Sequence, residues 1–412
     1  MLRIAHPICC GIDVHKTFVV ACIATTNDKN VTTYKTKRFS TYTNSLRQLS
    51  LWLEENNCKD VCMESTGKYW HPVYNVLELT CNVVLAHPKY LKAIRGKKTD
   101  KKDAKWIADV FKHDLVAGSF IPPAQIRELR DLLRYRFKLT SYTTGEKNRF
   151  QNSLTTSNIQ LASAFSDVFG KSAIAILDHM LHNPSDKNFD VTPFVHKLCK
   201  TPIEEIQMSI DGSISHEQSE KLKVIRTHMD NLALCKGQLD ETILSVAKQF
   251  LPQIELVLTV PGIKDFSAIN IIAEIGIDML QFPTSKHLCS WAGLAPQNNE
   301  SGGKKKSVRV SRAGVYIKPL LVQCANAAVK SNKHPEIKNR YVSLKKRRGH
   351  KRAIIAIARM LLTAIYNILK KNEPYNAELY SKPDVTPIDR EQAAILLLQK
   401  RGYSITKEDL VA

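Results

Sequence analysis

Strand-like runs of apolar residues open the chain, and regular alternation with helices follows them. Residues 8–25 contain two β-rich runs with a turn near His15, and residues 32–39 form a third run. Next come a helix at 45–55, a strand ending at Glu64, a helix from about Tyr69, a strand at 83–86, and a helix carrying Asp100 and Asp103. Three strands followed by alternating elements predict an α/β domain, to which we assign residues 1–125.

Helical periodicity replaces this alternation in the rest of the chain. Two long helical stretches, at about 128–161 and 217–250, flank a less regular segment and predict a coiled-coil-like helical arm over 126–250. An apolar helix ending at Gly276, a loop rich in glycine and lysine at 292–312, and helices at 313–331 and 351–371 then predict a mostly α-helical domain over 251–372. Residues 373–412 form a tail with one short amphipathic helix.

The balance of charge indicates a polyanionic partner. Lys and Arg total 60 against 39 acidic residues, a formal net charge of +21. Nucleic acid is the usual partner of such an excess, and a solvated basic surface or an anionic membrane are the alternatives. No uninterrupted apolar run of about 18 residues occurs, so we expect no membrane partner. The absence of a signal peptide and ten scattered cysteines without zinc spacing indicate a cytoplasmic protein with reduced thiols.

Four acidic residues occupy positions that ordinary surface acids seldom share. Asp13 and Glu64 end apolar strands, and Asp100 and Asp103 lie three apart on one helix face. If they converge, a divalent cation must offset their repulsion, and such cations clamp the attacking and leaving oxygens of a phosphodiester. Taken singly, each acid is equally compatible with a turn, a helix cap or a surface salt bridge. Taken together, in an α/β domain of a very basic chain, they favour a metal site.

A second candidate site lies in the loop around Ser301. Two glycines and three lysines follow this serine, and glycine lets a backbone approach a phosphate closely. The cations of the loop can offset the charge of a pentavalent transition state. Ser307 and Ser311 compete for the same role, and a flexible surface loop is the alternative. The sequence does not identify a base that would activate the hydroxyl.

Basic side chains surround both candidate sites and form a dense run near residue 348, where a solvated helix junction is the alternative. We expect them to contact a nucleic-acid backbone. The set comprises Lys97, Lys98, Lys101, Lys102, Lys304, Lys305, Lys306, Arg309, Arg312, Lys345, Lys346, Arg347 and Arg348. The turn Val260-Pro261-Gly262 is equally compatible with a phosphate-binding helix start and with a tight turn between packed helices.

Several motifs in this order resemble one known family. They are Gly-Ile-Asp13-Val-His-Lys, Glu64-Ser-Thr-Gly-Lys-Tyr-Trp, Lys-Thr-Asp100-Lys-Lys-Asp103-Ala, Val260-Pro-Gly-Ile, Trp291-Ala-Gly-Leu-Ala-Pro, Glu300-Ser301-Gly and Ser311-Arg-Ala-Gly. Together they resemble the DEDD insertion-sequence transposases, a family that includes Piv-type DNA invertases and bridge-RNA-guided recombinases. The resemblance covers about 1–125 and 250–372.

The resemblance implies an RNase H-like (RuvC-like) N-terminal domain whose Asp13, Glu64, Asp100 and Asp103 bind Mg²⁺. It also implies that Ser301 is the nucleophile and forms a phosphoserine link to DNA, so that religation needs no ATP. The chain would act as a homo-oligomer on element-end and target DNA, with a site built across subunits. A noncoding bridge RNA would pair with both DNAs.

Two other functions fit the same residues. A metal-dependent resolvase of Holliday-junction type would use the four acids alone and leave no protein–DNA link. A catalytically inactive nucleic-acid-binding relic would bind in a salt-sensitive way without chemistry. The intact set of four acids counts against the relic, because nothing would keep them in a DNA-binding groove without a cation.

Overall fold

The structure is a computed structural model that describes residues 2–65, 67–88, 99–183, 186, 189–296, 299–302, 304–307, 309–380 and 390–404. The chain forms two compact units, Met1–Pro122 and Pro123–Ala412. The finer division of the second unit into arm, C-terminal domain and tail remains a prediction.

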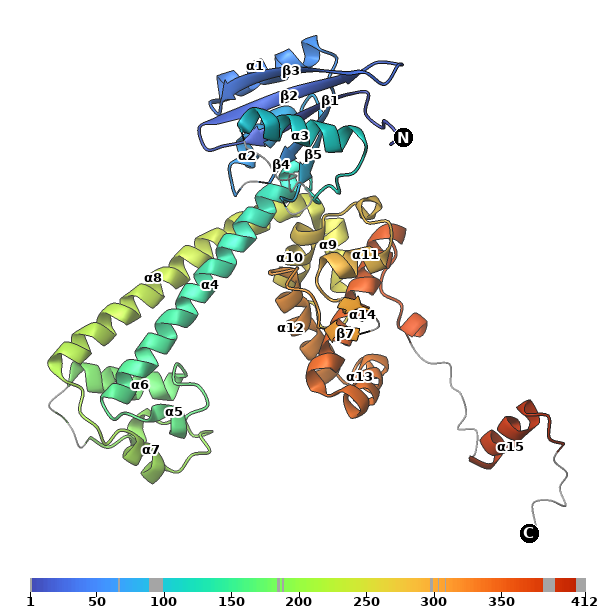
Figure 1. Ribbon diagram of the computed structural model, residues 1–412. Helices are drawn as coiled ribbons and strands as arrows, with labels where there is room; N and C mark the ends of the chain where they lie inside the picture. The colour runs from blue at the N-terminus through green and yellow to red at the C-terminus, as the bar shows by residue number, and fades with distance from the viewer. Residues whose placement is uncertain are drawn as a thin grey trace. The chain divides into compact units, whose positions relative to one another are not determined.

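The first unit contains a five-stranded mixed sheet (Figure 1), which confirms the predicted α/β layout. Its strands are β1 (Ile8–Val14), β2 (Phe18–Thr26), β3 (Thr32–Ser40), β4 (Asp60–Glu64) and β5 (Asn82–Ala86), in the order β3-β2-β1-β4-β5. The first three strands pair antiparallel, and β4 and β5 continue the sheet parallel to β1. The parallel half therefore brings the carboxyl ends of β1, β4 and β5 to one edge.

Alternate residues of β1 pack against helices on opposite faces of the sheet. Cys10, Ile12 and Val14 belong to a core with residues of α1 (Thr43–Glu55) and α2 (Trp70–Leu77). Cys9 belongs to a second core with Ile107 of α3 (Asp100–Lys112). Because Asp13 is an even number of residues from Cys9, it lies on the α3 face.

The backbone of α3 lies directly against β1 at Gly11. A Cβ atom at this position would come within 2.3 Å of both the Ala104 carbonyl oxygen and the Ala108 nitrogen. No side chain fits in that space, so the close approach requires glycine. Gly11 therefore sets the distance between the helix that carries Asp100 and the strand that carries Asp13.

A polar network fastens the other end of α3 to the sheet. The Tyr34 hydroxyl of β3 donates to Asp109 Oδ1 at 2.5 Å, and the buried Lys112 ammonium donates to the same oxygen at 2.7 Å. Buried polar groups that satisfy one another in this way favour a single arrangement of the elements they join. The position of α3 is thus fixed at its middle and at its C-terminal end.

The second unit contains two long helices, α4 (Ala124–Thr156) and α8 (His216–Ala247), which pack side by side (Figure 1) and are called the arm. Between them lie α5 (Leu161–Ala164), α6 (Lys171–His182), η1 (Thr192–Phe194) and α7 (Ile203–Ser209). These elements share a core that includes Phe150, Leu177 and Ile206. The segment predicted to be less regular thus consists of short helices separated by loops, and helices broken by proline and asparagine show little periodicity.

The remaining elements are mostly helical, as predicted. They are η2 (Lys248–Phe250), α9 (Leu251–Leu258), α10 (Asp265–Ile275), η3 (Met279–Gln281), α11 (Ser285–Trp291), α12 (Ile317–Lys330), α13 (Pro335–Arg348), α14 (His350–Lys371), η4 (Ala377–Tyr380) and α15 (Arg390–Lys400). By length and apolar composition, α14 is the one helix among those described that could cross a membrane, and 61% of its apolar window is buried inside the protein.

The sequence did not predict α13, in which Ile337 is the single buried residue.

Charged groups join the arm to α10. Arg134 forms two hydrogen bonds with the Glu274 carboxylate, at 2.8 and 2.9 Å, and Arg130 donates to the carbonyls of Ala273 and Glu274. Arg136 pairs with Asp240 of α8. Bidentate arginine pairs of this kind hold helices in one orientation, so the arm and the helices after it are linked within the second unit.

We expect Gly11→Ala to lower the free energy of unfolding by about 3 kcal/mol, because the added methyl group overpacks β1 against the α3 backbone. Chemical denaturation followed by circular dichroism measures this loss. The matched control is Gly237→Ala in α8, where a Cβ meets nothing within 4 Å. That change should raise stability by up to about 1 kcal/mol, because alanine favours a helix. Equal stability of Gly11→Ala and the native chain would contradict the packing argument.

Candidate functional site

Asp13 and Glu64 end neighbouring parallel strands. The register pairs Ile12 with Met63, so the two acids are the next residues along β1 and β4. Glu64 follows Cys62 by two residues, and Cys62 belongs to the core shared with α3. Both acids are therefore placed at the carboxyl edge of the sheet on the α3 face.

The other two predicted acids occupy the first turn of α3. Asp100 is the first residue of the helix, and Asp103 lies three residues later on the same side. Thr99 caps this end, since its hydroxyl accepts a hydrogen bond from the Lys102 nitrogen at 3.3 Å. The positive end of the helix dipole favours acids here, which explains locally why two carboxylates are tolerated together.

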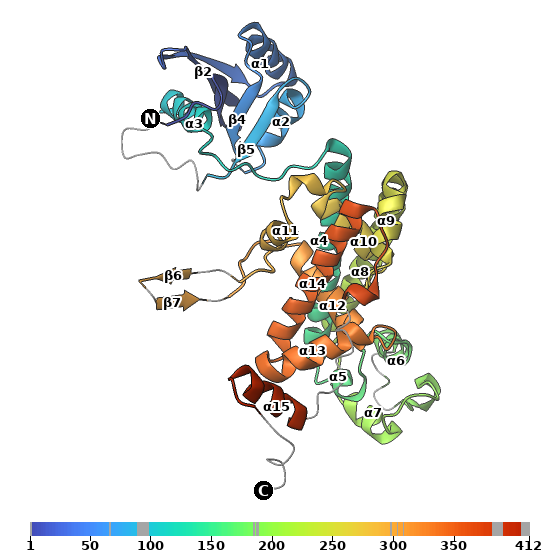
Figure 2. The same cartoon turned by 90° about the vertical axis from the view of Figure 1, so that its right-hand side faces the viewer.

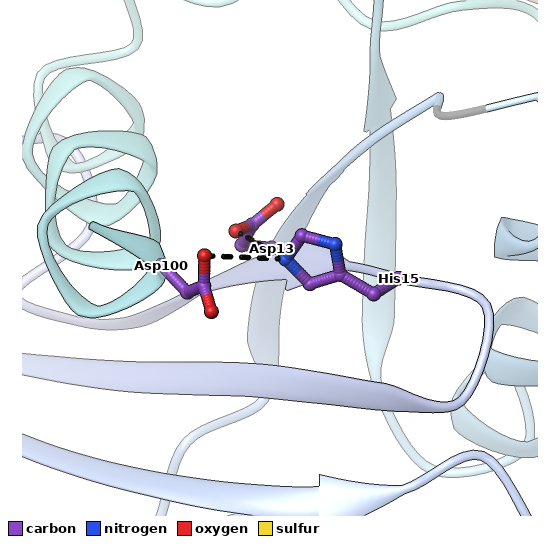
Figure 3. Close-up of side chains that lie close together, drawn as sticks. All are labelled: Asp13, His15 and Asp100. Atoms are coloured by element: carbon purple, nitrogen blue, oxygen red, sulfur yellow. Dashed lines mark hydrogen bonds and ion pairs between the residues drawn. The ribbon is translucent and has the colours of Figure 1, made fainter. Parts of the chain in front are cut away.

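His15, a side chain for which the sequence predicted no role, lies between two of these acids (Figure 3). Its Nε2 is 3.1 Å from Asp13 Oδ2 and 3.5 Å from Asp100 Oδ1. Among the described residues, Asp13, His15 and Asp100 offer ligand atoms that all lie within 4.8 Å of one another. The signal available in the sequence was the spacing Asp-Val-His at the end of a strand.

The His15 ring is held in place from its other side. It packs on Phe18 with ring centroids 4.5 Å apart, and the Arg38 guanidinium lies 3.6 Å from the centre of the same Phe18 ring. Such cation–π and aromatic contacts restrict the ring without using its nitrogens. His15 therefore presents Nε2 toward the carboxylates from a fixed position.

The electrostatics of Asp13 indicate an incompletely balanced negative charge. Burial raises the pKa of the Asp13 carboxyl, His15 opposes this shift, and Asp103 and Asp100 raise the pKa further. Asp103 thus lies close enough to act on Asp13 although it is outside the three-residue cluster. Carboxylate oxygens and one imidazole nitrogen are donors that a divalent cation accepts, so the residues present fit such an ion.

Ser301 ends β6 (Asn299–Ser301), which pairs antiparallel with β7 (Lys304–Ser307). Figure 2 shows the two strands side by side in the loop that the sequence suggested was irregular. Ser301 is opposite Lys304, and Gly302 has φ +59° with nothing within 4 Å of an added Cβ. The backbone thus places Ser301 beside the turn of a hairpin; the side chains of Ser301, Lys304, Lys305 and Lys306 lie outside the described residues.

The two ends of this loop meet through glycines. A Cβ on Gly293 would approach the Ala313 carbonyl oxygen to 2.4 Å, and one on Gly314 would approach that of Ala292 to 2.1 Å. Both glycines have positive φ, which only glycine adopts readily. Ser311 lies at this closed base, where its carbonyl accepts a bond from Lys318 Nζ at 2.6 Å. The structure therefore separates Ser311 from the hairpin turn that carries Ser301.

The predicted basic contacts divide into those with described, exposed side chains and those outside the described residues, which include the side chains of Lys304, Lys305 and Lys306. Lys101, Lys102, Arg309 and Arg312 have exposed side chains, as do Lys345, Lys346, Arg347 and Arg348 in the last turn of α13. Lys97 and Lys98 lie outside the described residues.

At the Pro261 turn, a Cβ on Gly262 would come within 2.3 Å of the Cys324 carbonyl oxygen in α12. This close contact supports the interpretation of the segment as a tight turn between packed helices.

The buried cysteines offer no competing nucleophile in the sheet. Burial raises the pKa of Cys9 and of Cys62 to about 12, so both thiols remain protonated at neutral pH. Each belongs to the core beneath α3. They act there as small apolar residues.

Comparison with known families identifies transposases at both ends of the chain. A DEDD-type model of the IS110 group, described as transposase, matches residues 10–159. A model described as the transposase IS116/IS110/IS902 family matches residues 254–342. The first match contains all four acids, and the second contains Ser301. Both motif blocks on which the family resemblance depends are thus recovered in the expected order.

Curated relatives match nearly the whole chain. The transposase for insertion sequence element IS1111A of Coxiella burnetii is 22% identical over 369 residues, covering 89% of this chain and 90% of that protein. The pilin gene-inverting protein of Moraxella lacunata is 22% identical over 396 residues, covering 90% of this chain and 98% of that protein. A probable family 20 transposase of Pseudomonas aeruginosa is 22% identical over 76% of this chain and 85% of that protein. Similarity therefore extends through the arm.

Asp13→Asn should raise the melting temperature of the metal-free protein at pH 7. The raised pKa means that ionising Asp13 costs stability, a cost that appears as pH rises from the ordinary carboxyl value through the folded-state value. The difference from the native chain should therefore vanish in acid. Saturating Mg²⁺ should make the native chain the more stable of the two proteins. A cation at a hundredfold excess over Kd adds about 2.7 kcal/mol to the free energy of unfolding of the native protein alone.

Differential scanning calorimetry with EDTA or Mg²⁺ measures both effects. Asp28→Asn, in the exposed turn after β2, is the control and should respond to Mg²⁺ as the native chain does. Equal stabilisation of Asp13→Asn and the native chain by Mg²⁺ would place the cation elsewhere.

Proposed function

Because this chain belongs to the IS116/IS110/IS902 family of transposases, which cut and rejoin DNA, we propose that it recombines insertion-sequence DNA through two centres. One is a divalent-cation site of Asp13, Glu64, Asp100 and Asp103, and the other is the Ser301 hydroxyl. The convergence of Asp13 and Asp100 on one point is the observation that carries the proposal. Relatives named for transposition and for gene inversion support it.

The fold of the first unit is, in this proposal, RNase H-like. Three antiparallel strands followed by two parallel ones, in the order β3-β2-β1-β4-β5, support this assignment. So does the location of two acids at the carboxyl ends of β1 and β4, beside a helix that supplies two more. The sheet provides rigid positions for the acids, as a catalytic site requires.

The four carboxylates would hold Mg²⁺, which when bound offsets charge on a scissile phosphate. Asp13 and Glu64 are fixed by the sheet, and Asp100 and Asp103 by the first turn of α3. His15 holds Asp13 and Asp100 through Nε2, so it positions these carboxylates before DNA arrives. The exposed Lys101 and Lys102 contact the DNA backbone beside them.

Ser301 carries out the bond exchange in this proposal. Its Oγ attacks phosphorus, a Ser–O–P bond forms, and the bond from phosphorus to one deoxyribose oxygen breaks. The serine proton leaves to a base, and the departing oxygen takes up a proton. Religation reverses these steps with a new strand end, so the phosphodiester energy is conserved and no ATP is consumed.

The remaining partners follow from the family and from charge. Element-end and target DNA bind along the exposed basic side chains, including Arg309, Arg312 and those that end α13. A noncoding bridge RNA guides the choice of both DNAs. The acids and Ser301 belong to different compact units, and we propose that units of two subunits in a homo-oligomer complete each site. The enzyme works in the cytoplasm on chromosomal and element DNA.

Ser301→Ala should abolish the covalent protein–DNA product. The protein is incubated with labelled element-end DNA, the adjoining element RNA and Mg²⁺, and the products are separated on a denaturing gel. The native chain should give a band that protease removes, whereas Ser301→Ala gives none because the attacking oxygen is missing. Ser311→Ala, at the base of the loop, is the matched control and should keep the band.

Two outcomes would contradict this assignment. Loss of the band in Ser311→Ala or Ser307→Ala, with retention in Ser301→Ala, would identify another serine. Cleaved DNA without a covalent band in any protein would favour the resolvase, in which water attacks.

Mixing two inactive variants tests the composite site. Asp103→Asn lacks a carboxylate, and Ser301→Ala lacks the nucleophile, so neither alone should form an adduct. In a mixed dimer, one of the two composite sites has both intact acids and an intact serine, so up to about half of the sites should form the adduct. DNA should be attached only to the Asp103→Asn chain, which keeps its serine. Distinguishing the chains by a size tag on the gel shows which one carries DNA. No adduct in the mixture would show that each subunit builds its own site.

A further inference from the structure

One side of α4 carries aromatic, basic and polar side chains in a stripe. Tyr135, Lys138, Tyr142, Arg149 and Asn152 are all exposed, and they follow one another at spacings of three, four, seven and three residues. These spacings place them on one helix face. Tyr135 and Tyr142 are 57% and 55% exposed, large fractions for aromatic side chains. Exposed aromatic rings between cations are typical of surfaces that bind single-stranded nucleic acid.

A cavity interrupts this stripe where the helix has no side chain. Gly145 lies on the same helix face, three residues after Tyr142 and four before Arg149, and leaves a gap in the stripe. Beside it lies a cavity of about 420 Å³. It is lined by Ser141, Tyr142, Gly145, Glu146 and Arg149 of α4 and by His228 of α8. This volume falls in the range of ligand-binding sites, about 300–1,000 Å³. Glycine in the middle of a helix weakens it, so its presence here keeps space open at some cost.

The cavity contains a buried carboxylate. Glu146 is 9% exposed, and its Oε1 accepts a hydrogen bond from Arg149 at 2.6 Å and lies 3.3 Å from His228 Nδ1. Both contacts use Oε1, which leaves Oε2 without a hydrogen bond to any described residue. The Arg149 and His228 side chains are 64% and 54% exposed. Exposed partners of this kind can exchange for a ligand, unlike the fully packed partners of a structural ion pair.

We propose that this cavity binds one unpaired guanine of a single-stranded nucleic acid. The Watson–Crick edge of guanine presents two adjacent donors, N1–H and the N2 amino group, to the two oxygens of one carboxylate. Adenine, cytosine and uracil each place an acceptor next to their donor, so Glu146 pairs well with guanine alone. Tyr142 stacks on the base, while Arg149 swings to the guanine O6 or to a phosphate.

This inference deepens the proposed function, since it gives the nucleic-acid partner a contact on the arm. It does not depend on strand cleavage. The arm lies in the second unit, whereas the carboxylates of the cation site lie in the first. Loss of the guanine contact and loss of chemistry are therefore separable by experiment.

Fluorescence anisotropy of the full chain with labelled twelve-nucleotide strands tests the pocket. Strands carry a single guanine, inosine or adenine in an otherwise uridine or thymidine background, as RNA and as DNA. The native protein should bind the guanine strand about tenfold more tightly than the adenine strand, as a good bidentate base contact allows. Inosine, which lacks the N2 amino group, should lose most of this preference. A guanine preference seen only with RNA strands, or only with DNA strands, shows which nucleic acid the pocket binds. An equal preference with both shows that the pocket binds guanine in either.

Three variants complete the test. Glu146→Gln should abolish the preference for guanine and leave the affinity for the adenine strand unchanged. The reason is that the amide replaces one of the two acceptor oxygens by a donor. Tyr142→Ala should lower the affinity for every strand about tenfold, because it removes the ring on which the base stacks. Tyr42→Ala, which removes a still more exposed tyrosine before α1 in the first unit, is the control and should leave the affinity for every strand unchanged. Circular dichroism melting confirms that each variant is folded.

The outcomes separate this pocket from the chemistry. No guanine preference in the native chain, or an unchanged preference in Glu146→Gln, overturns the pocket even if the covalent DNA adduct forms. A guanine preference that persists in Ser301→Ala and Asp103→Asn supports it, and would stand even if no adduct were ever found.

Discussion

The packing of α3 directly on β1 is the constraint on which the candidate site depends. At Gly11 the helix backbone comes so close that no side chain can intervene. Two residues further along β1, Asp13 meets the first turn of that helix, where Asp100 begins it. The distance between strand and helix thus determines whether these carboxylates face one another. The Tyr34–Asp109–Lys112 network holds the other end of α3 and prevents it from tilting.

Close approach of several acids creates an electrostatic cost that the fold meets only in part. The helix dipole and His15 favour the ionised carboxylates, whereas burial and mutual repulsion raise the pKa of Asp13. A site that is stable without a cation but strained by its own charge is ready to accept one. The same reasoning explains why a positively charged chain concentrates acids at this single edge of the sheet.

Most of the first unit could be predicted from sequence, because its strands and helices have clear apolar periodicity and end at polar turns. Asp13 and Glu64 were selectable because each lies at the end of an apolar strand, and Asp100 and Asp103 because they lie three residues apart at the start of a helix. His15 was missed since a histidine after a strand carries no periodic signal. The small helical bundle at the end of the arm and α13 were missed because short or exposed helices bury too few residues to show a period. The β6–β7 hairpin was hidden by its lysines and glycines, which favour strands weakly.

The central claim is that α3 and the sheet together build a cation site, and a crystal of the full chain grown with Mn²⁺ tests it most directly. Anomalous scattering locates the ion without reference to activity. We expect a peak within about 2.0–2.5 Å of an Asp13 oxygen, next to the carboxylates of α3 and Glu64, and we expect it to disappear in Asp13→Asn. A saturating concentration of Mn²⁺ that leaves this edge empty, or a peak bound by other residues, would contradict the account.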